Sequence, residues 1–327
     1  MLPNFSYVRP TSLAEAITHL AAPGTSVLAG GTDLLGCLRD RTFDVRKVVS
    51  LRRVNALRGI AVDAGAGLRV GALTTLAEVA RHPIVNERYT ALAQAAESVA
   101  SPQLRNQGTM GGNLCQRPRC WYFRGDFHCV RKGGDTCYAM GGENQYHCIF
   151  GGSACLMVHP SDTATALVAL GAQANLAGPR GSRTVPLDSF FVLPEQDATK
   201  ENVLEAGEIL TEVTVPTPPV GFVSTYRKVR ARGAWDFALA GVAVALSFKQ
   251  GKVDTARVVL GAAAPIPWRA KDAEKALVGS RLDPKTIGLV ADAAIKGAAP
   301  LEQNNYKLAM FRGALQEVLE ALVAIGR

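Results

Sequence analysis

Residues 27–35 read Val-Leu-Ala-Gly-Gly-Thr-Asp-Leu-Leu, an apolar run that passes through two glycines into a pair of leucines. This pattern predicts a short buried strand, a tight turn and the first turn of a helix. Glycines let backbone N–H groups approach an anion closely, and a helix start adds unpaired N–H groups and a favourable dipole. The stretch lacks G-x-G-x-x-G and G-K-[ST], so it is neither a Rossmann fingerprint nor a P-loop. A tight strand-to-helix turn without a ligand is the alternative interpretation.

Two further polar segments could belong to the same site. Gly108–Asn113 is a second loop rich in glycine and threonine, and two such loops converging on one pyrophosphate are more persuasive than either alone. Ser161-Asp162-Thr163 stands at the start of another predicted helix. Asp162 either caps this helix or accepts hydrogen bonds from ribose hydroxyls, and the residues alone leave both interpretations open.

Six of the seven cysteines lie within one segment: Cys115, Cys120, Cys129, Cys137, Cys148 and Cys155. Such clustering in a chain without signs of secretion indicates metal or iron–sulfur ligation rather than disulfides. The absence of a C-x-x-C pair argues against a zinc ribbon and suits an iron–sulfur cluster held by a long loop. Buried free thiols are the alternative. His128 and His147, in the same segment, are more typical of hydrogen-bonded structural histidines than of ligands.

Basic residues are interspersed with the cysteines between residues 117 and 132, against a single carboxylate in that stretch, Asp126. The basic residues are Arg117, Arg119, Arg124, Arg131 and Lys132. We expect their positive field to stabilise thiolates and an anionic cluster.

The composition is that of a globular protein of two or three subdomains, with 327 residues of which 48% are hydrophobic and 20% charged. The net charge is +8, but the basic residues are scattered and only 6% of residues are aromatic, so we expect no nucleic-acid partner. The longest apolar run, 238–248, is too short to span a bilayer, and the first seven residues do not resemble a secretory signal. We therefore expect no membrane association and a cytoplasmic location, unless a partner subunit carries the chain elsewhere.

The order of elements predicts an α+β protein. The N-terminal part reads β-α-β, and the longest helix is predicted over 305–324. Pro216-Thr217-Pro218-Pro219 is stiff and cannot pair in a sheet, which places a domain boundary near residue 217. The strands predicted after the cysteine segment are 172–176, 209–215, 222–229, 241–248 and 253–261.

Three motifs, in this order, resemble those of one protein family: residues 29–35, Leu-Arg-Asn-Gln-Gly-Thr-Met-Gly-Gly-Asn-Leu (104–114) and Pro-Ser-Asp-Thr-Ala-Thr-Ala-Leu (160–167). The family is the FAD-binding medium subunit of molybdenum hydroxylases, the xanthine dehydrogenase and carbon monoxide dehydrogenase group. The resemblance extends from Phe5 to the last helix. It implies a two-lobed FAD-binding domain of the vanillyl-alcohol oxidase type over 1–217, and a smaller α+β C-terminal domain with an antiparallel sheet over 218–327.

The cysteine segment, about 113–156, narrows the resemblance to one branch of the family. That branch contains the bacterial aldehyde oxidoreductase flavoprotein subunit and the 4-hydroxybenzoyl-CoA reductase β subunit, whose members carry an extra [4Fe–4S] cluster in this loop. Matching the motif implies as cluster ligands Cys120, Cys129, Cys137 and Cys155. Cys148 has no counterpart, yet it lies between two of these ligands.

Carried over residue by residue, the resemblance also implies the FAD contacts. Asp162 would bind a ribose or the ribityl chain, and Lys228 would reach the flavin side, unless it is a solvated strand residue. The diphosphate would be cradled by Ser26, Val27, Leu28, Ala29, Gly30, Gly31, Thr32, Asp33, Leu34, Thr109, Gly112 and Asn113.

The function implied is that of an electron relay. A large molybdenum-cofactor subunit would oxidise the substrate, a small subunit with [2Fe–2S] clusters would pass electrons to FAD on this chain, and FAD would deliver them to an external acceptor. Two alternatives are a self-contained FAD oxidase and an iron–sulfur scaffold or sensor without flavin. Neither the substrate nor the acceptor is specified by this chain.

Overall fold

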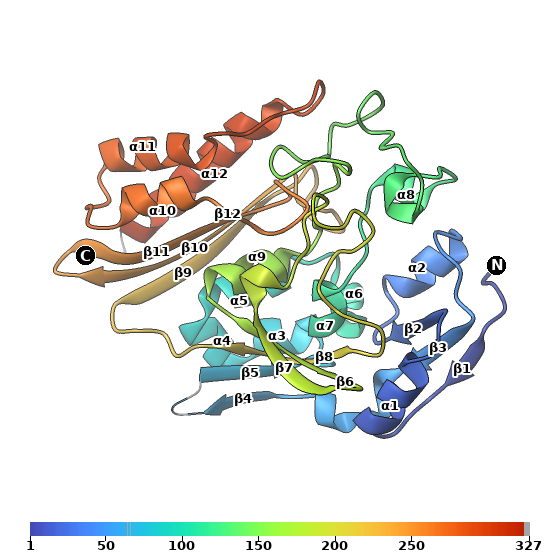
Figure 1. The fold of residues 1–327 in the computed structure, drawn as a ribbon. Helices are drawn as coiled ribbons and strands as arrows, with labels where there is room; N and C mark the ends of the chain where they lie inside the picture. The colour runs from blue at the N-terminus through green and yellow to red at the C-terminus, as the bar shows by residue number, and fades with distance from the viewer. Residues whose placement is uncertain (64, 66, 324–327) are drawn as a thin grey trace.

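The N-terminal lobe forms where short apolar strands alternate with amphipathic helices. The computed structural model describes residues 1–63, 65 and 67–323, and Figure 1 shows their ribbon. Three parallel strands lie in the order β1-β3-β2. The elements of the lobe are β1 (Ser6–Val8), α1 (Leu13–Leu20), β2 (Thr25–Leu28), α2 (Leu34–Arg39) and β3 (Lys47–Ser50).

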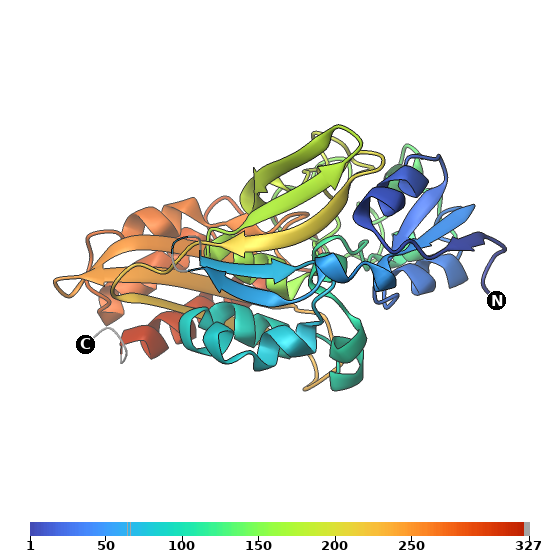
Figure 2. The same ribbon diagram turned by 90° about the horizontal axis from the view of Figure 1, so that it is seen from below.

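A five-stranded antiparallel sheet lies between this lobe and the C-terminal part of the chain (Figure 2). Its strands, in the order β4-β5-β8-β6-β7, are β4 (Ile60–Asp63), β5 (Gly67–Gly71), β8 (Ile209–Val215), β6 (Gln173–Gly178) and β7 (Gly181–Pro186). The chain leaves the sheet after β5 and returns in β6. The helices of this excursion are α3 (Leu76–Arg81), α4 (Pro83–Arg88), α5 (Thr90–Ser98), α6 (Pro102–Gln107), α7 (Met110–Leu114), α8 (Trp121–Arg124) and α9 (Asp162–Ala169).

The C-terminal part is a four-stranded antiparallel sheet in the order β12-β11-β10-β9, enclosed by helices on both faces. Helices α10 to α12 cover one face, and α5 and α9 pack against the other (Figure 1). The elements are β9 (Phe222–Val229), β10 (Ala240–Lys249), β11 (Lys252–Gly261), β12 (Trp268–Arg269), α10 (Lys271–Leu277), α11 (Pro284–Ala294) and α12 (Tyr306–Val323).

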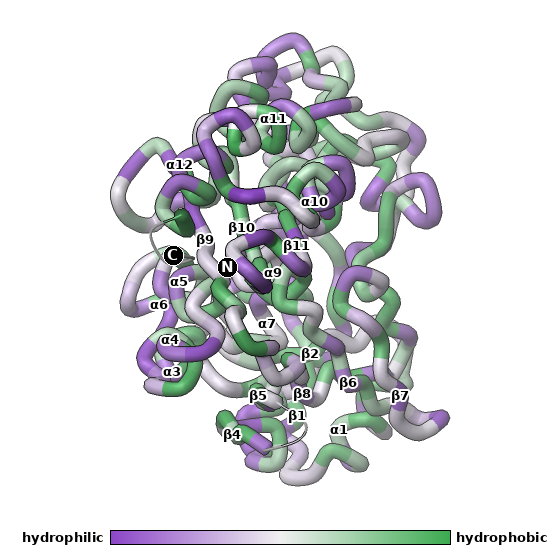
Figure 3. Tube along the Cα trace, turned by 90° about the vertical axis from the view of Figure 1, so that its left-hand side faces the viewer, coloured by the Kyte–Doolittle hydropathy of each residue, from purple (hydrophilic) through white to green (hydrophobic). Residues whose placement is uncertain are grey.

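Strand β10 is almost entirely buried because it has a core on each side, and Figure 3 shows its largely hydrophobic course. Successive side chains of a strand point to opposite faces. The larger side chains pack in the core shared with α10 to α12: Val242, Val244 and Leu246. Ala243 and Ala245 belong to the core shared with α5 and α9. Ala243 and Ala245 therefore face α5 and α9, and their small side chains let α9 lie close to the sheet.

The cysteine segment is held against the C-terminal part by the start of α12. Buried Lys307 donates from Nζ to the carbonyl oxygens of Tyr146 (3.2 Å), His147 (3.0 Å) and Ala262 (2.8 Å). Asn304 donates to the carbonyl oxygens of His147 and Cys148. Burial lowers the pKa of Lys307 to about 8, below its usual range. A segment with little regular structure is thus fixed at its backbone by a second domain.

The predicted α+β class and the antiparallel C-terminal sheet are confirmed. Strands β8 and β9 have the predicted bounds, and the predicted boundary at residue 217 lies in the connection between them. Ala324, the predicted end of the last helix, lies outside the described residues. Strand β7 is not predicted, because its exposed polar sequence lacks the apolar alternation of a half-buried strand. In the described part of the chain, no helix has the length and apolar character needed to cross a bilayer.

Candidate functional site

The first glycine loop joins β2 to α2 and presents unbonded backbone donors. In the described part of the chain, the N–H groups of Gly30, Gly31, Thr32 and Asp33 donate to no backbone carbonyl. Gly31 has a φ of +81°, which favours glycine, and a Cβ at Gly30 would lie 1.9 Å from the carbonyl oxygen of Gln107. The loop therefore packs directly on the second glycine segment and leaves a row of donors for an external acceptor.

Most backbone N–H groups of the second glycine loop are already hydrogen-bonded within the chain. Thr109 caps α7 by accepting from the N–H of Gly112 (3.2 Å), and the N–H of Asn113 bonds to the carbonyl of Thr109 (2.8 Å). The amide oxygen of Asn113 accepts from the hydroxyls of Ser161 and Thr163, both at 2.6 Å. This loop thus serves chiefly as a rigid wall, and the first loop supplies the free amides.

Two grooves meet at these loops. The first groove is lined by Ser26, Val27, Ala29, Gly30, Gly31, Thr32, Asp33, Leu34, Thr109 and Gly112 among others. The second groove shares Gly31, Thr32, Asp33 and Gly112 with the first and adds Asn113, Asp162 and Lys228. All but one of the predicted cofactor residues therefore line a continuous path. The exception is Leu28, whose side chain packs against the small core around Leu38 and Val48.

Asp162 lies at the first turn of α9 and is held by two groups from β9. Its carboxylate accepts from the hydroxyl of Tyr226 (2.6 Å) and from the ammonium of Lys228 (2.7 Å). Both side chains of the ion pair are nearly inaccessible, 6% and 4% exposed. Lys228 also donates to the carbonyl of Ser98. Ser161, not Asp162, is the cap of α9, and Lys228 is not a solvated strand residue.

The four cysteines predicted as ligands line one small cavity together with Arg131 and His147: Cys120, Cys129, Cys137 and Cys155. A hydrogen bond from the Cys137 thiol and the nearby charge of Arg131 lower the pKa of Cys155 to about 6. Burial raises the pKa of Cys120 to about 11. Arg131 donates from Nε to the Cys155 sulfur at 3.4 Å.

The remaining cysteines stand apart from this cavity. Cys148 is buried against Ala139 and Leu156, and Cys115 and Cys37 line the first groove. Of the described residues, no three His, Cys, Asp or Glu side chains lie close enough to share one metal ion. His147 contacts Cys120 at 3.3 Å through Nε2, and burial lowers the pKa of His147 to about 4. The histidine is therefore neutral at neutral pH.

The five basic residues expected to give a positive field are partly paired with two distant carboxylates. Arg119 and Arg124 pair with Asp33, and Arg117 pairs with Glu201. Lys132 donates to a backbone carbonyl. Only Arg131 contacts a cysteine, and it also pairs with Glu201. The carboxylates that balance the arginines come from distant parts of the sequence, which is why counting local charges missed them.

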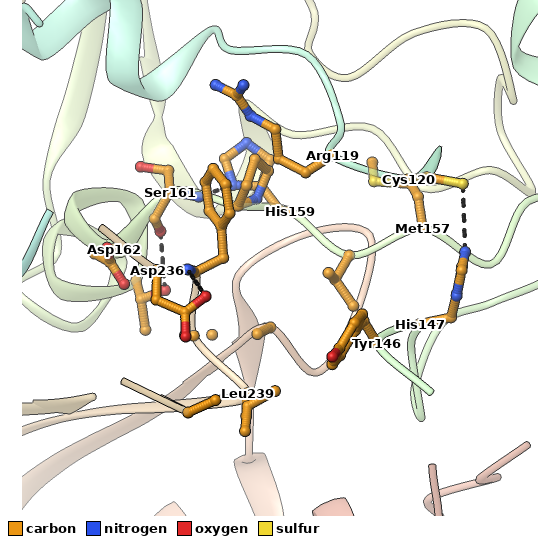
Figure 4. Close-up of a pocket in the computed structure, with 18 of the residues that line it drawn as sticks. Arg119, Cys120, Tyr146, His147, Met157, His159, Ser161, Asp162, Asp236 and Leu239 are labelled. Atoms are coloured by element: carbon orange, nitrogen blue, oxygen red, sulfur yellow. Dashed lines mark hydrogen bonds between the residues drawn. The ribbon is translucent and has the colours of Figure 1, made fainter. Parts of the chain in front are cut away.

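Between the second groove and the cysteine cavity lies a third cavity (Figure 4). It shares Arg119 and Asp162 with the second groove and Cys120 and His147 with the cysteine cavity. The second groove, which contains Asp162 and Lys228, and the cysteine cavity are therefore neighbours. Sequence reasoning missed Tyr226, although a signal was present, since Tyr226 and Lys228 lie two residues apart on one strand and share a face.

Comparison with known proteins identifies both halves of the chain. A model of the FAD binding domain in molybdopterin dehydrogenase matches residues 3–218, and a model of the CO dehydrogenase flavoprotein C-terminal domain matches residues 224–322. The chain is 35% identical over 322 residues to the aldehyde oxidoreductase FAD-binding subunit PaoB of Escherichia coli (strain K12). That alignment covers 96% of this chain and 97% of the relative.

A solved structure of carbon monoxide dehydrogenase from Hydrogenophaga pseudoflava has a similar chain, with a TM-score of 0.78 and 30% identity. The match covers 99% of both chains. Quinoline 2-oxidoreductase from Pseudomonas putida 86 gives a TM-score of 0.77 at 27% identity, over 100% of this chain and 99% of that one. The likeness therefore includes both halves and not a shared domain alone.

The buried pair of Asp162 and Lys228 yields a stability prediction. Asp162→Asn leaves a buried ammonium without its counter-ion, so we expect the free energy of unfolding to fall by about 3 kcal/mol. Adding Lys228→Met should restore most of this loss, because the unpaired charge is then gone. Urea denaturation of the wild type, Asp162→Asn, the double variant and Asp292→Asn measures these free energies of unfolding. Asp292→Asn, which breaks an exposed pair with Arg312, is the control and should cost under about 1 kcal/mol. An equal loss in both single variants contradicts the prediction.

Proposed function

This chain belongs to the family of FAD-binding subunits of the molybdopterin dehydrogenases and is an oxidoreductase subunit, and we propose that it relays electrons through FAD within a larger molybdenum enzyme. One observation carries the proposal. Gly31, Thr32 and Asp33 line both grooves and Gly30 lines the first, and the N–H groups of all four donate to no backbone carbonyl, so they are available to the anionic centre of an extended ligand.

The described residues fit FAD in charge and shape. The amides of the first loop would hold the diphosphate, with Thr109 and Gly112 as the opposite wall. Asp162 would accept from ribityl or ribose hydroxyls, and Lys228 would orient it at the flavin side. When bound, FAD supplies exchange between one-electron and two-electron carriers. We assign residues 1–217 to FAD binding and 218–327 to the C-terminal domain, which contributes Lys228.

We further propose that the cysteine segment holds a [4Fe–4S] cluster, as in the branch with an additional cluster. Four thiols of one cavity support this, and so does a cationic neighbour, Arg131, because a cluster ligated by thiolates is anionic.

We propose two partners, a small [2Fe–2S] subunit and a large molybdenum-cofactor subunit, with the assembly in the cytoplasm or carried elsewhere by a partner. Two of the relatives are named medium chains of carbon monoxide dehydrogenase. The buried carboxylate of the second groove, Asp162, is held by Tyr226 and Lys228, so we expect substrate chemistry on a partner subunit and not at this carboxylate.

FAD is expected to be bound noncovalently, since the site is built from backbone donors and polar side chains. Acid precipitation of the purified chain should release about one FAD per chain into the supernatant. Flavin that stays with the precipitated protein, or protein that purifies without flavin, contradicts the prediction.

Cys129→Ser is expected to abolish the cluster, because a missing thiolate leaves one iron without its ligand. Anaerobically purified wild type should hold about four irons per chain. The matched controls are Cys115→Ser and Cys148→Ser, whose sulfurs lie outside the cysteine cavity, and both should retain iron. Zinc in place of iron in the wild type, or iron loss only in Cys148→Ser, shows the ligand assignment to be wrong.

The partner proposal predicts what an affinity tag on this chain retrieves from its own host. We expect two companion chains, one with molybdenum and one with [2Fe–2S] clusters detectable by electron paramagnetic resonance. The assembly should oxidise an aldehyde or heterocycle, whereas the isolated chain with FAD and iron–sulfur should not. Robust turnover by the isolated chain would sink the proposal.

A further inference from the structure

The carboxylate of Asp33 joins the first glycine loop to the cysteine segment. It accepts from Nη2 of Arg124 at 2.7 Å and from the backbone N–H of Arg117 at 2.8 Å. Arg119 pairs with the same carboxylate at 2.9 Å. Although Asp33 precedes α2, its side chain makes no capping hydrogen bond there. The carboxylate is committed to the other segment.

A second path runs from the same arginines to a cysteine. Arg117 pairs with Glu201 at 3.1 Å, and Glu201 pairs with Arg131 at 2.9 Å. Arg131 in turn donates to the sulfur of Cys155. The path therefore connects Asp33 to the cysteine cavity through neighbouring charged groups.

The pairs of Asp33 with Arg124 and of Glu201 with Arg131 are shielded from water, whereas the side chains of Arg117 and Arg119 are 29% and 32% exposed. The side chains of Asp33 and Arg124 are 16% and 14% exposed, and those of Arg131 and Glu201 are 1% and 7% exposed. Pairs at this depth are screened far less by salt than surface pairs, and breaking one leaves a poorly hydrated charge. The arginine positions consequently constrain Asp33, and through it the backbone of the first loop.

The position of the arginines depends in turn on the cysteines. Arg117, Arg119 and Arg124 flank Cys120, in a stretch whose only regular element is the short helix α8. A loop of this kind loses much conformational entropy on ordering, so it needs a cross-link or a bound group to keep one shape. The cluster proposed above would join Cys120 to three cysteines that follow it.

We propose that the cysteine segment clamps the FAD site, with Asp33 as the positioning residue, so that losing the cluster weakens FAD binding. The proposal rests on the proposed function. With the four cysteines joined, the arginines hold Asp33 and the amides of Gly30 to Asp33 face the grooves. Without that cross-link, the arginines and the loop are free to move. Because coupling between two sites is reciprocal, bound FAD must also stabilise the cluster.

Arg124 allows a test because it lines neither groove. It contacts the groove-lining residues Asp33, through the ion pair, and Arg117, through the backbone carbonyl. The full chain is first purified, and its FAD is then removed. FAD is then added back, with the dissociation constant measured by flavin fluorescence and iron measured in the same samples. We expect Arg124→Gln to bind FAD about tenfold more weakly with its iron retained, and Cys129→Ser to be weakened by a similar factor.

The double variant identifies the shared path. If both changes break one link, the double variant with Arg124→Gln and Cys129→Ser binds FAD no more weakly than the single variant with the lower FAD affinity. Arg124→Lys should recover most of the affinity, because it keeps a charge opposite Asp33. Arg312→Gln, which breaks an exposed pair of equal length with Asp292, is the control and should bind FAD like the wild type.

Iron release to a chelator gives an independent readout. FAD should slow the release in the wild type and in Arg312→Gln, and have little effect in Arg124→Gln. Wild-type FAD affinity in Cys129→Ser, or losses that multiply in the double variant, would overturn the clamp. Thermal unfolding of the FAD-free chains completes the test: the proposal requires Arg124→Gln to stay folded at the temperature of the FAD titration, and a chain that is already unfolded there overturns it. A wild type with FAD but no iron refutes the cluster, and the iron assay detects this before any variant is compared.

Discussion

Unbonded backbone amides at the turn between β2 and α2 are the constraint on which the rest of the site depends. Gly30, Gly31 and Asp33 are half-buried, where an N–H group without an acceptor is costly, so a loop that leaves their N–H groups and that of exposed Thr32 open is suited to a ligand. The surrounding structure keeps that loop from closing on itself. Gly30 packs on the carbonyl of Gln107 with no room for a side chain, and the second glycine loop is fixed by its own hydrogen bonds.

Each of the other parts of the chain holds one piece of this arrangement. The C-terminal sheet brings Lys228 and Tyr226 to Asp162, which lies on a helix packed against α5 and one face of that sheet. The start of α12 fixes the backbone of the cysteine segment through Lys307. The arginines of that segment neutralise Asp33, which would otherwise place a negative charge beside an anionic ligand. The division into lobes is thus also a division of tasks around one groove.

Sequence patterns predicted much of the regular fold, because segments rich in apolar and β-branched residues mark strands such as β8, β10 and β11. They also predicted the four cysteines that meet at one cavity, through the resemblance and not through spacing. What they missed was long-range pairing. Asp33 with Arg124, and Glu201 with Arg131, are separated by 91 and 70 residues, and no local pattern links them. Tyr226 was within reach, since its spacing from Lys228 places both on one face of a strand.

The central claim is that one chain holds FAD across the two glycine loops and iron in the cavity of Cys120, Cys129, Cys137 and Cys155. A crystal of the purified assembly, with diffraction data at the iron absorption edge, tests both parts at once. The account predicts an anomalous peak inside that cavity and flavin density that passes the amides of Gly30 to Asp33 towards Lys228. An empty cysteine cavity beside an occupied FAD groove, or flavin density elsewhere, would contradict it.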